Sequence, residues 1–572
     1  MEKNKNHIIL SLTTNHDAGV ACYIDNGEGV FDAHNLLYIN EERLNREKYT
    51  RKFPQESLKV VKKFLKVKDG VPCTILVASQ FTPSFVLKLF DFIPIKRENP
   101  FSYFLNLYVV YHHIVKKYNV LRRMECLLTK LLYSRKLRVR AKDILLYDHH
   151  QCHSSGAYYA SGFSNALVFT LDMMGDYLSI TVSIGKEGTQ TRIFEQGALN
   201  GIGNFYGKIT HLLGFKLHRH EGKVTGLAAY GKVDDKILVK LKEIFAFDIK
   251  TGGFTYLDYL LDFKRNYFDF IYLKRFKKED VAATAQYYFE REISKFVDFW
   301  IEKTQIRNVC LAGGIFANVK LNQRIHESTA VDNIFIFPHM GDGGLAFGAL
   351  MDYIKPQPFT LNDVYCGLVF SNEEIESILI NKKIPFVFYD NIEKKIAELI
   401  AEDKVVARFN GKMEFGPRAL GNRSILYQAT DKNVNDWLNE RLKRTEFMPF
   451  APVVLDRYAH KCFKNLKGGE YAAKFMTLTF DCTDYIKNIC PGVVHVDGTA
   501  RPQILSQNDN PSFYRILDYY YELTGIPVLI NTSFNIHEEP IVCTPEDALS
   551  AFRRGHLDYL AIGNYLMSKE KQ

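Results

Sequence analysis

The chain has 572 residues, of which 47% are hydrophobic and 24% are charged; these ordinary globular values exclude a disordered chain, and 36 Gly with 18 Pro are too few for a collagen-like one. At roughly 150 residues per domain, this length predicts two or three domains. The net charge is +9, but residues 81–142 hold 13 Lys and Arg against 3 Asp and Glu, so the rest of the chain is close to neutral.

The cysteines and the beginning of the chain indicate a cellular compartment. Ten Cys are scattered without a Cys-x-x-Cys pair, which argues against a zinc ribbon or a thioredoxin-type site. The apolar run over residues 8–12 is too short for a signal peptide, and no segment has the length and composition of a membrane span. We therefore expect a cytoplasmic protein with free thiols.

The opening of the chain predicts a strand over residues 8–13, a turn over 15–19 and a second strand over 20–24. An amphipathic, Lys-rich helix is expected over residues 51–69. Residues 81–142 are basic and aromatic, and we expect them to form helices inserted into a larger domain.

Three short apolar strands then end in Gly-rich turns. The strands are expected at residues 166–171, 308–311 and 333–337, and the turns at 172–176, 312–314 and 342–344. Apolar strands that feed such turns, with helices between them, predict α/β architecture. Ligands bind such sheets beyond the carboxyl ends of the strands, where these turns fall.

A second domain is expected to follow the Pro-containing junction at residues 355–358, giving domains over 1–356 and 357–572. Within it, the sequence predicts a helix over 373–383 and strands over 405–409 and 527–530.

Two imidazoles near the middle of the first domain have the spacing of metal ligands. On a helix, His149 and His153 share one face, as two imidazoles on one ion require. Asp172 and Asp342 each follow an apolar strand and could add carboxylate oxygens. Nitrogen and oxygen ligands suit iron, manganese or zinc. The alternative is that both imidazoles only pack against neighbouring side chains.

The Gly turns of the first domain predict a nucleotide site, because backbone N–H groups freed by Gly can hold a phosphate. Tight turns without a ligand are the alternative. No Walker A or Gly-x-Gly-x-x-Gly motif stands in a suitable context, which disfavours P-loop and Rossmann folds. Lys223 could neutralise a phosphate, although composition alone favours a surface turn leading into a helix for residues 220–231.

A cationic set distinguishes the second domain. Residues 415–424 place Arg418 and Arg423 in a loop stiffened by Gly and Pro. Further basic and polar side chains follow at Lys443, Arg444 and Arg501 and over residues 531–535. Arg forks and Ser or Asn donors on turns predict a polyanion-binding site, with solvated surface charge as the alternative.

His16 lies in the first turn of the chain. An imidazole titrates near neutral pH and could therefore act as a general base on an incoming hydroxyl group. Composition alone favours the other interpretation, a His that only stabilises the turn.

Taken in this order, these segments resemble the NodU/CmcH family of O-carbamoyltransferases, which includes nodulation-type and antibiotic-tailoring enzymes. The segments that carry the resemblance are residues 15–18, 149–153, 221–231, 312–314, 341–344, 415–424 and 531–535. The resemblance implies an actin/sugar-kinase-like (ASKHA) ATPase fold for residues 1–356, as in the tRNA threonylcarbamoyl transferase. It implies a YrdC-like α/β fold for residues 357–572.

The resemblance also implies a reaction. The C-terminal domain would convert carbamoyl phosphate and ATP to carbamoyl adenylate. The N-terminal domain would transfer the carbamoyl group to a hydroxyl of a sugar or natural-product acceptor, as in natural-product or polysaccharide biosynthesis. The implied cofactors are ATP with Mg²⁺ and a divalent metal, with Fe²⁺ ahead of Mn²⁺ and Zn²⁺. No nucleic acid is expected as a partner, and a homodimer is compatible with the sequence.

Four sets of site residues follow from the resemblance. The metal would be held by His149, His153, Asp342 and Asp172. The catalytic residues would be His16, Lys443 and Arg423. The nucleotide would contact Gly175, Lys223, Gly313, Gly314 and Asn318. Carbamoyl phosphate and its adenylate would contact Arg418, Arg423, Ser424, Lys443, Arg444, Arg501, Ser533 and Asn535.

Other functions stay open from the residues alone. These are a tRNA-modifying enzyme of the threonylcarbamoyladenosine type, a sugar kinase on the same fold and a nucleotide-sensing module without turnover. Three interpretations also remain for residues 81–142: a basic lid for an anionic acceptor, a patch in peripheral contact with a membrane, or a plain helical embellishment.

Overall fold

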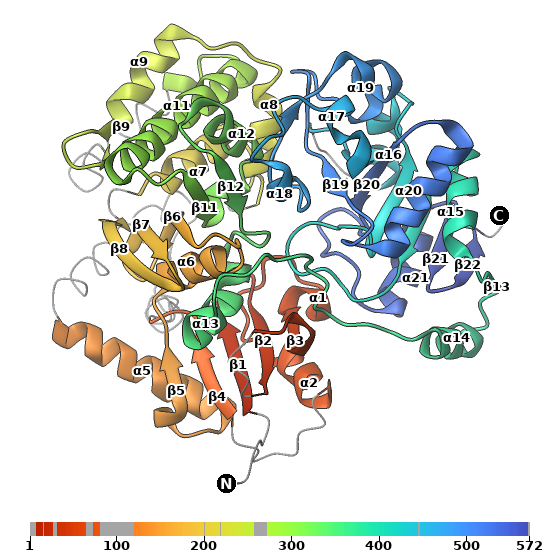
Figure 1. The fold of residues 1–572 in the computed structure, drawn as a ribbon, viewed down its shortest axis with the longest axis horizontal. Coiled ribbons are helices and arrows are strands. Elements are labelled where there is room, and N and C mark those ends of the chain that lie inside the picture. Colours follow the sequence, from red (N-terminus) through yellow and green to blue (C-terminus); the bar gives the residue numbers. More distant parts are fainter. Residues whose placement is uncertain are drawn as a thin grey trace. The chain divides into compact units, whose positions relative to one another are not determined.

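The computed structural model describes residues 7–14, 16–26, 31–64, 73–80, 119–198, 201–217, 219–256, 272–443 and 447–569. They belong to two compact units (Figure 1). The first unit comprises Met1–Leu36 and Thr50–Thr360, and the second comprises Leu37–Tyr49 and Leu361–Gln572. Both contain mixed sheets with helices, so the predicted α/β class is confirmed.

The first unit contains two mixed sheets and a β-hairpin. Its strands are β1 (His7–Thr13), β2 (Gly19–Asp25), β4 (Cys73–Val77), β5 (Ile144–Leu146), β6 (Asn165–Gly175), β7 (Leu178–Lys186), β8 (Thr189–Gly197), β9 (Phe245–Asp248), β10 (Gly253–Tyr256), β11 (Asn308–Ala312) and β12 (Asn333–Ile336). Its helices are α2 (Gln55–Phe64), α5 (Asn119–Leu137), α6 (His149–Tyr159), α7 (Gly203–Leu212), α8 (Glu221–Ala228), α9 (Asp235–Ile244), α11 (Lys278–Thr304), α12 (Val319–Ser328) and α13 (Leu345–Ile354).

One strand pattern occurs twice in this unit. An antiparallel pair is extended by two parallel strands, in the order β2-β1-β4-β5 and again in the order β7-β6-β11-β12. Helices α6 and α13, which follow the last strand of each set, pack against each other. Helix α6 also packs on β6, β7 and β11, whereas α13 packs on β1, β2 and β4. The two similar halves therefore meet at this pair of helices.

The second unit is built around one large sheet. Its strands are β13 (Val387–Phe388), β14 (Val406–Phe409), β15 (Arg423–Gln428), β16 (Ala451–Leu455), β17 (Phe480–Asp481), β18 (Thr499–Ala500), β19 (Gln503–Leu505), β20 (Val528–Ser533), β21 (Tyr559–Ile562) and β22 (Tyr565–Ser568). Its helices are α1 (Glu41–Asn45), α14 (Asn372–Asn381), α15 (Ile392–Ala401), α16 (Val434–Arg441), α17 (Ala459–Cys462), α18 (Glu470–Ala473), α19 (Asp484–Ile489), α20 (Pro511–Thr524) and α21 (Pro545–Arg554).

The large sheet has the order β13-β22-β21-β14-β15-β20-β16-β19 and mixes parallel with antiparallel pairs. Helices α15 and α20 pack on it and close a core in which Ile400, Phe513 and Leu517 are fully buried. The register of β15 against β20 pairs Ser424 with Ser533. This register brings the end of the loop 415–424 next to the segment 531–535.

Residues 37–49 belong to the second unit, although their position in the sequence predicts the first domain. They hold most of β3 (Leu36–Asn40) and all of α1. The Tyr38 N–H donates to the carbonyl oxygen of Cys366 at 2.9 Å. The Arg46 guanidinium donates to the carbonyl oxygens of Pro540 and Ile541 at 2.7 and 2.8 Å. The segment is therefore anchored by polar contacts as well as by packing.

Most predicted strands and helices are confirmed, but one turn is wrong. Strand β6 extends to Gly175, with a register irregularity between Leu171 and Gly175. Residues 172–175 therefore lie in a strand instead of a phosphate-binding turn. The tight turn follows at Asp176 and Tyr177, which both have positive φ, and leads directly into antiparallel β7.

The predicted insertion is described in part. Residues 81–118 lie outside the described residues, whereas α5 forms a helix as expected. Among the described residues, no helix is both long enough and apolar enough to cross a membrane.

Candidate metal centre and arginine loop

Helix α6 presents two imidazoles on one face. It begins after Asp148, whose Oδ1 accepts from the Gln151 N–H at 2.8 Å and also pairs with Arg192 at 2.6 Å. Because the helix starts at this cap, His149 and His153 are one turn apart, and both are buried. The predicted helical spacing of the two imidazoles is therefore present.

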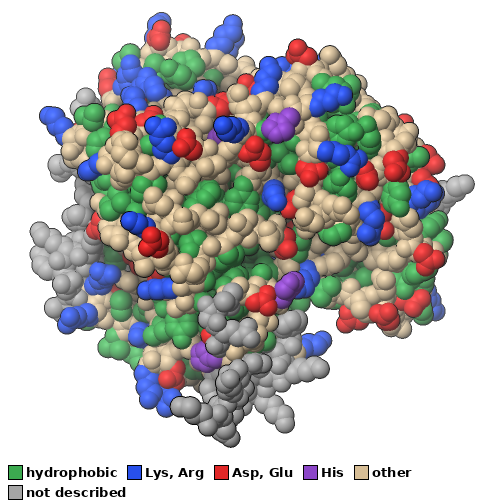
Figure 2. Space-filling model, in the orientation of Figure 1, with side chains coloured by type: hydrophobic (Ala, Val, Ile, Leu, Met, Phe, Trp, Pro, Cys, Tyr) green, Lys and Arg blue, Asp and Glu red, His purple; other side chains and the backbone are tan. Residues whose placement is uncertain are grey.

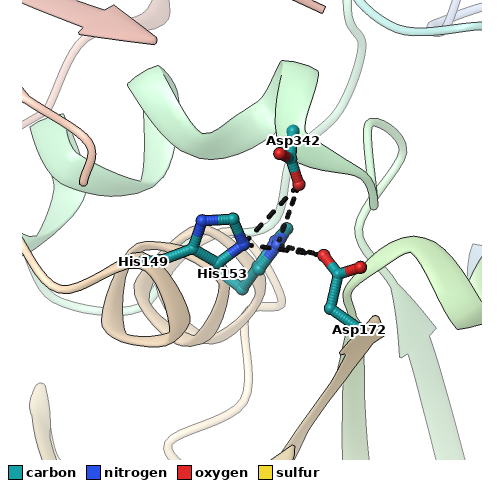
Figure 3. A group of neighbouring side chains, drawn as sticks. All are labelled: His149, His153, Asp172 and Asp342. Atoms are coloured by element: carbon teal, nitrogen blue, oxygen red, sulfur yellow. Dashed lines mark hydrogen bonds and ion pairs between the residues drawn. The ribbon is translucent and has the colours of Figure 1, made fainter. Parts of the chain in front are cut away.

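Two carboxylates complete the cluster (Figure 3). Asp172 comes from β6, and Asp342 begins the 3-10 turn (Asp342–Gly344) that leads into α13. His149 Nε2 lies 3.5 Å from an Asp172 oxygen and 3.6 Å from an Asp342 oxygen. The corresponding distances from His153 Nε2 are 3.3 and 3.9 Å. The four ligand atoms all lie within 4.8 Å of one another, which is a spacing that one cation can bridge.

The protonation of these groups reflects their crowding. Burial and the carboxylates of Asp172 and Asp17 raise the pKa of Asp342 well above its ordinary value. Burial would raise the pKa of Asp172 as well, but hydrogen bonds from His149 and His153 outweigh it and hold that pKa low. A divalent cation would replace the shared protons, since it is bound by neutral imidazoles and ionised carboxylates. The buried two-nitrogen, two-oxygen set therefore fits a divalent transition metal.

A third carboxylate, that of Asp176, fixes the backbone beside the candidate metal ligands. Asp176 Oδ2 accepts from the backbone N–H groups of His149 and Gln80 at 2.9 and 2.8 Å, and Oδ1 accepts from the Ser79 hydroxyl at 2.7 Å. Gly175 covers the His149 imidazole so closely that a Cβ there would lie 2.1 Å from the ring. Gly175, expected at the nucleotide, is thus in contact with a predicted metal ligand.

Of the other predicted nucleotide residues, Gly313 and Gly314 lie in the turn after β11, and Asn318 lies at the beginning of α12. Gly313 has φ of +102°, and a Cβ there would lie 2.1 Å from the Leu171 carbonyl oxygen. A Cβ on Gly314 would lie 3.4 Å from Asp172 Oδ1, so this turn borders the metal centre. Asn318 caps α12, and its amide pairs with the Gln286 amide at 2.9 and 3.1 Å. The polar atoms of the Asn318 side chain are therefore used in hydrogen bonds within the protein.

Lys223 lies within α8 and is 7% exposed. Residues 221–228 are helical and residues 229–231 form a turn and a bend, so most of the segment 220–231 is a helix and not the surface turn that composition alone favoured.

His16 is held by an arginine. Arg51 NH2 lies 2.7 Å from His16 Nε2, and because a guanidinium only donates, Nε2 accepts this hydrogen bond. Its neighbour Asp17 acts electrostatically on Asp342, so this first turn of the chain lies near the metal centre. Asp17 was not among the predicted site residues.

In the second unit, residues 415–424, here called the arginine loop, surround a buried carboxylate. Glu414 Oε1 accepts from the backbone N–H groups of Leu420, Asn422 and Arg423 at 3.0, 2.7 and 3.1 Å. Glu414 is 5% exposed and was not identified from the sequence. A carboxylate that accepts three backbone N–H groups fixes the conformation of the loop.

The Arg423 side chain faces the protein interior. It is fully buried and lies 3.7 Å from the centre of the Phe409 ring. Its two terminal nitrogens donate to the carbonyl oxygens of Asn410, Gly411, Asn422 and Leu368. These bonds use the terminal donors that we expected to bind a phosphate, so we assign Arg423 to the support of the loop. Ser424 is also buried, and its hydroxyl accepts from the Gly421 N–H at 3.0 Å.

The remaining predicted phosphate ligands differ in exposure. Arg418 and Arg501 are half-buried, and Arg501 lines a small cavity together with His495, Thr479 and Thr499. Lys443 is exposed after the end of α16, with φ of 56°. The Asn535 amide donates to the carbonyl oxygens of Ile536 and Glu539, and its oxygen accepts from the Ser533 hydroxyl. Arg444 lies outside the described residues.

Comparisons with known proteins cover most of the chain. Residues 95–351 match the family model "Carbamoyltransferase N-terminus", and residues 397–569 match "Carbamoyltransferase C-terminus". "Uncharacterized protein MJ1051" of Methanocaldococcus jannaschii is 38% identical over 75% of this chain and 84% of its own length. Nodulation protein NolNO of Sinorhizobium fredii is 30% identical over 99% of this chain and 81% of its own. A solved structure of full-length HypF aligns with 62% of this chain and 56% of its own, at 13% identity and a TM-score of 0.34.

Proposed function

The chain belongs to the carbamoyltransferase family, and we propose that it is an ATP-dependent O-carbamoyltransferase that uses carbamoyl phosphate and modifies a hydroxyl group of a sugar or natural product. The observation that carries this proposal is the buried cluster of His149, His153, Asp172 and Asp342 in the first unit. We propose that this site, with a metal ion bound, would hold the leaving group while the acceptor approaches.

The chemistry explains why the reaction would consume ATP. Carbamate is a poor electrophile, because its nitrogen donates electrons into the carbonyl group. We propose that carbamoyl phosphate is hydrolysed to carbamate and phosphate, and that a carbamate oxygen attacks the α-phosphorus of ATP with loss of pyrophosphate. The acceptor hydroxyl oxygen then attacks the carbamoyl carbon of the adenylate, and AMP leaves with the C–O bond electrons. The products are AMP, pyrophosphate, phosphate and the carbamate ester.

The first unit would carry out the transfer step. His149, His153, Asp172 and Asp342 would hold the divalent metal, with Fe²⁺ as the first candidate before Mn²⁺ and Zn²⁺. When bound, the metal supplies Lewis-acid stabilisation of the phosphate that leaves. The turn at Gly313 and Gly314 borders the same centre, which supports our proposal that it would contact the adenylate.

We propose His16 as the base that accepts the proton of the acceptor hydroxyl. Because Arg51 donates to Nε2, this nitrogen carries no proton, and its lone pair accepts the Arg51 hydrogen bond. Exchange of the Arg51 hydrogen bond for one from the acceptor would allow the proton to move to Nε2.

The second unit would form the adenylate. Arg418, Arg501 and Lys443 are the basic residues of the predicted set that are described and reach the surface, and we propose that they bind the phosphates of ATP and carbamoyl phosphate together with Arg444. Arg423 and Glu414 would act through the backbone of the arginine loop.

We propose an ASKHA-type fold for the first unit and a YrdC-like fold for the second. The twice-occurring strand pattern of the first unit supports the former, since two similar mixed sheets with packed helices between them are expected of such an ATPase. The mixed sheet covered by α15 and α20 is compatible with the latter.

The test is a turnover assay with carbamoyl phosphate, ATP, Mg²⁺, Fe²⁺ and a panel of hydroxylated acceptors. We expect AMP and pyrophosphate only when carbamoyl phosphate is present, and an acceptor that gains the mass of CONH in mass spectrometry. Formation of ADP without carbamoyl phosphate would indicate the sugar kinase instead. Nucleic acid that copurifies and is released by RNase would indicate the tRNA-modifying enzyme.

A further inference from the structure

Helix α5 carries an outward face that neither the metal centre nor the arginine loop uses. Met124, Leu127 and Leu131 are 54%, 57% and 50% exposed. Positions i, i+3 and i+7 lie along one side of a helix, so the three side chains form one apolar stripe. Within the described part of the chain, the other exposed hydrophobic side chains are not arranged in this way on a basic helix.

Basic residues flank the stripe on both sides. Residues 122–142 contain eight Lys and Arg and one acidic residue on the helix, Glu125, which is buried on the inner face. Arg123 and Arg135 are exposed on turns of the helix next to the stripe. In Figure 2, basic and hydrophobic side chains are interspersed over the region of α5. The outer face thus combines apolar and positive groups and has no exposed negative group between residues 122 and 142.

The inner face is fixed to the first unit. Tyr133 is 3% exposed and hydrogen-bonds the Thr14 hydroxyl, and its ring packs against Phe53. Arg122 donates to the Gln80 side chain at 2.7 Å. The helix therefore packs on the first unit through its inner face, and among the described residues its outer face is exposed.

We propose that the outer face of α5 docks the protein onto a bilayer that contains anionic lipids. Leu and Met side chains can enter the acyl-chain boundary while the flanking guanidinium groups pair with lipid phosphates, as in interfacial amphipathic helices. A nucleic acid would pair with the basic groups but would leave the apolar stripe in water, so the stripe favours the bilayer. This docking goes beyond the proposed reaction and does not depend on it.

The experiment is flotation of the full-length protein with vesicles in the absence of substrates. Vesicles of phosphatidylcholine alone are compared with vesicles in which roughly one third of the lipid is phosphatidylglycerol. We expect the protein to float with the anionic vesicles, and we expect high salt to release it because screening weakens the attraction.

Two pairs of substitutions test the two components separately. Arg123→Gln with Arg135→Gln should weaken the partition coefficient about 25-fold, at about fivefold for each charge. Leu127→Asn with Leu131→Asn should weaken it about tenfold or more. The matched control is Val239→Asn with Lys236→Gln on the outer side of α9, where Val239 is 55% exposed; it should bind like the wild type.

The changed side chains are exposed, so all variants should keep the wild-type unfolding midpoint. The Arg pair tests the charged component of the surface, and the Leu pair tests the apolar component. Equal flotation with neutral and anionic vesicles would overturn the proposal. Wild-type flotation of both α5 double variants would overturn it as well. The proposal would also fail if the wild-type protein bound RNase-sensitive nucleic acid in place of vesicles and the α5 variants lost that binding.

Discussion

The metal centre of the first unit and the arginine loop of the second use buried charge in opposite ways. At the metal centre, four side chains direct their ligand atoms toward one another, with His–Asp distances of 3.3 to 3.9 Å. At the arginine loop, the buried side chains of Arg423 and of the adjacent Glu414 direct their polar atoms to the backbone. Facing side chains of this kind suit the binding of a ligand, whereas charges bound to the backbone make a rigid support.

This difference changes how the two regions should respond to substitution. Loss of a side chain at the metal centre should remove a ligand and leave the fold intact. Loss of Arg423 or Glu414 should weaken the fold and disturb ligand binding only as a consequence. Four substitutions test the comparison.

The largest effect is expected for His149→Ala. Removal of one imidazole from a four-ligand site should abolish stoichiometric metal binding and lower carbamoyl transfer by at least about a thousandfold, with adenylate formation largely retained. Metal content by mass spectrometry and pyrophosphate release measure the two parts. His460→Ala, at an exposed position of the second unit, is the control. An unchanged metal content in His149→Ala would remove this residue from the site.

Arg423→Ala should act through stability. The substitution leaves four backbone carbonyl groups without their charged donor, and we expect the free energy of unfolding to fall by about 3 to 5 kcal/mol. Urea unfolding measures this change. Arg418→Ala, at a half-buried position of the same loop, should keep stability within about 1 kcal/mol and lose adenylate formation. If the two variants unfold alike, the distinction between support and ligand fails.

Asp176→Ala tests the support of the metal centre. Loss of the bonds to His149, Gln80 and Ser79 should weaken metal affinity about 10- to 100-fold without removing a ligand. Asp176→Asn is the matched control. Its amide keeps an acceptor, the Ser79 hydroxyl can turn to accept from its NH₂ group, and Asn tolerates the positive φ. In a metal titration, the Asp176→Asn variant should bind the metal with an affinity close to that of the wild type. If the Asp176→Ala variant also binds the metal as tightly as the wild type, the supporting role of Asp176 is contradicted.

The smallest effect is expected for Lys443→Ala. This Lys is exposed, so its removal should leave stability within about 0.5 kcal/mol. A solvated charge–phosphate contact should contribute about tenfold to KM for ATP or carbamoyl phosphate, with little change in kcat. Initial rates of pyrophosphate release give both constants. A KM equal to that of the wild type would show that Lys443 does not contact either substrate.

The same contrast explains what could be predicted from the sequence. The His149 and His153 pair was predictable because four residues make about one helical turn, and Asp172 and Asp342 because each follows an apolar run in the sequence. The α/β class followed from the same strands and turns. For Arg423, residue type and Gly-Pro neighbours identify a rigid loop but cannot say whether the guanidinium faces a ligand or a carbonyl group.

Other features were not predictable because they depend on contacts between distant residues. Asp17 and Asp176 lie in segments that the sequence singled out, and Glu414 directly precedes one, but only the folded chain places these three carboxylates beside their partners. The inclusion of residues 172–175 in β6 was missed because Gly175 and Asp172 are typical of turns. In the structure, the antiparallel partner β7 extends the strand through an irregular register.

The membership of residues 37–49 in the second unit has a consequence for dissecting the protein. A gene fragment that starts after Thr360 would lack the Arg46 side chain, which donates to the carbonyl groups at Pro540 and Ile541, and would lack the Leu44 side chain that packs with Met413 and Ala419. Such a fragment should be recovered only when a peptide with the sequence of residues 37–49 is coexpressed or fused to it.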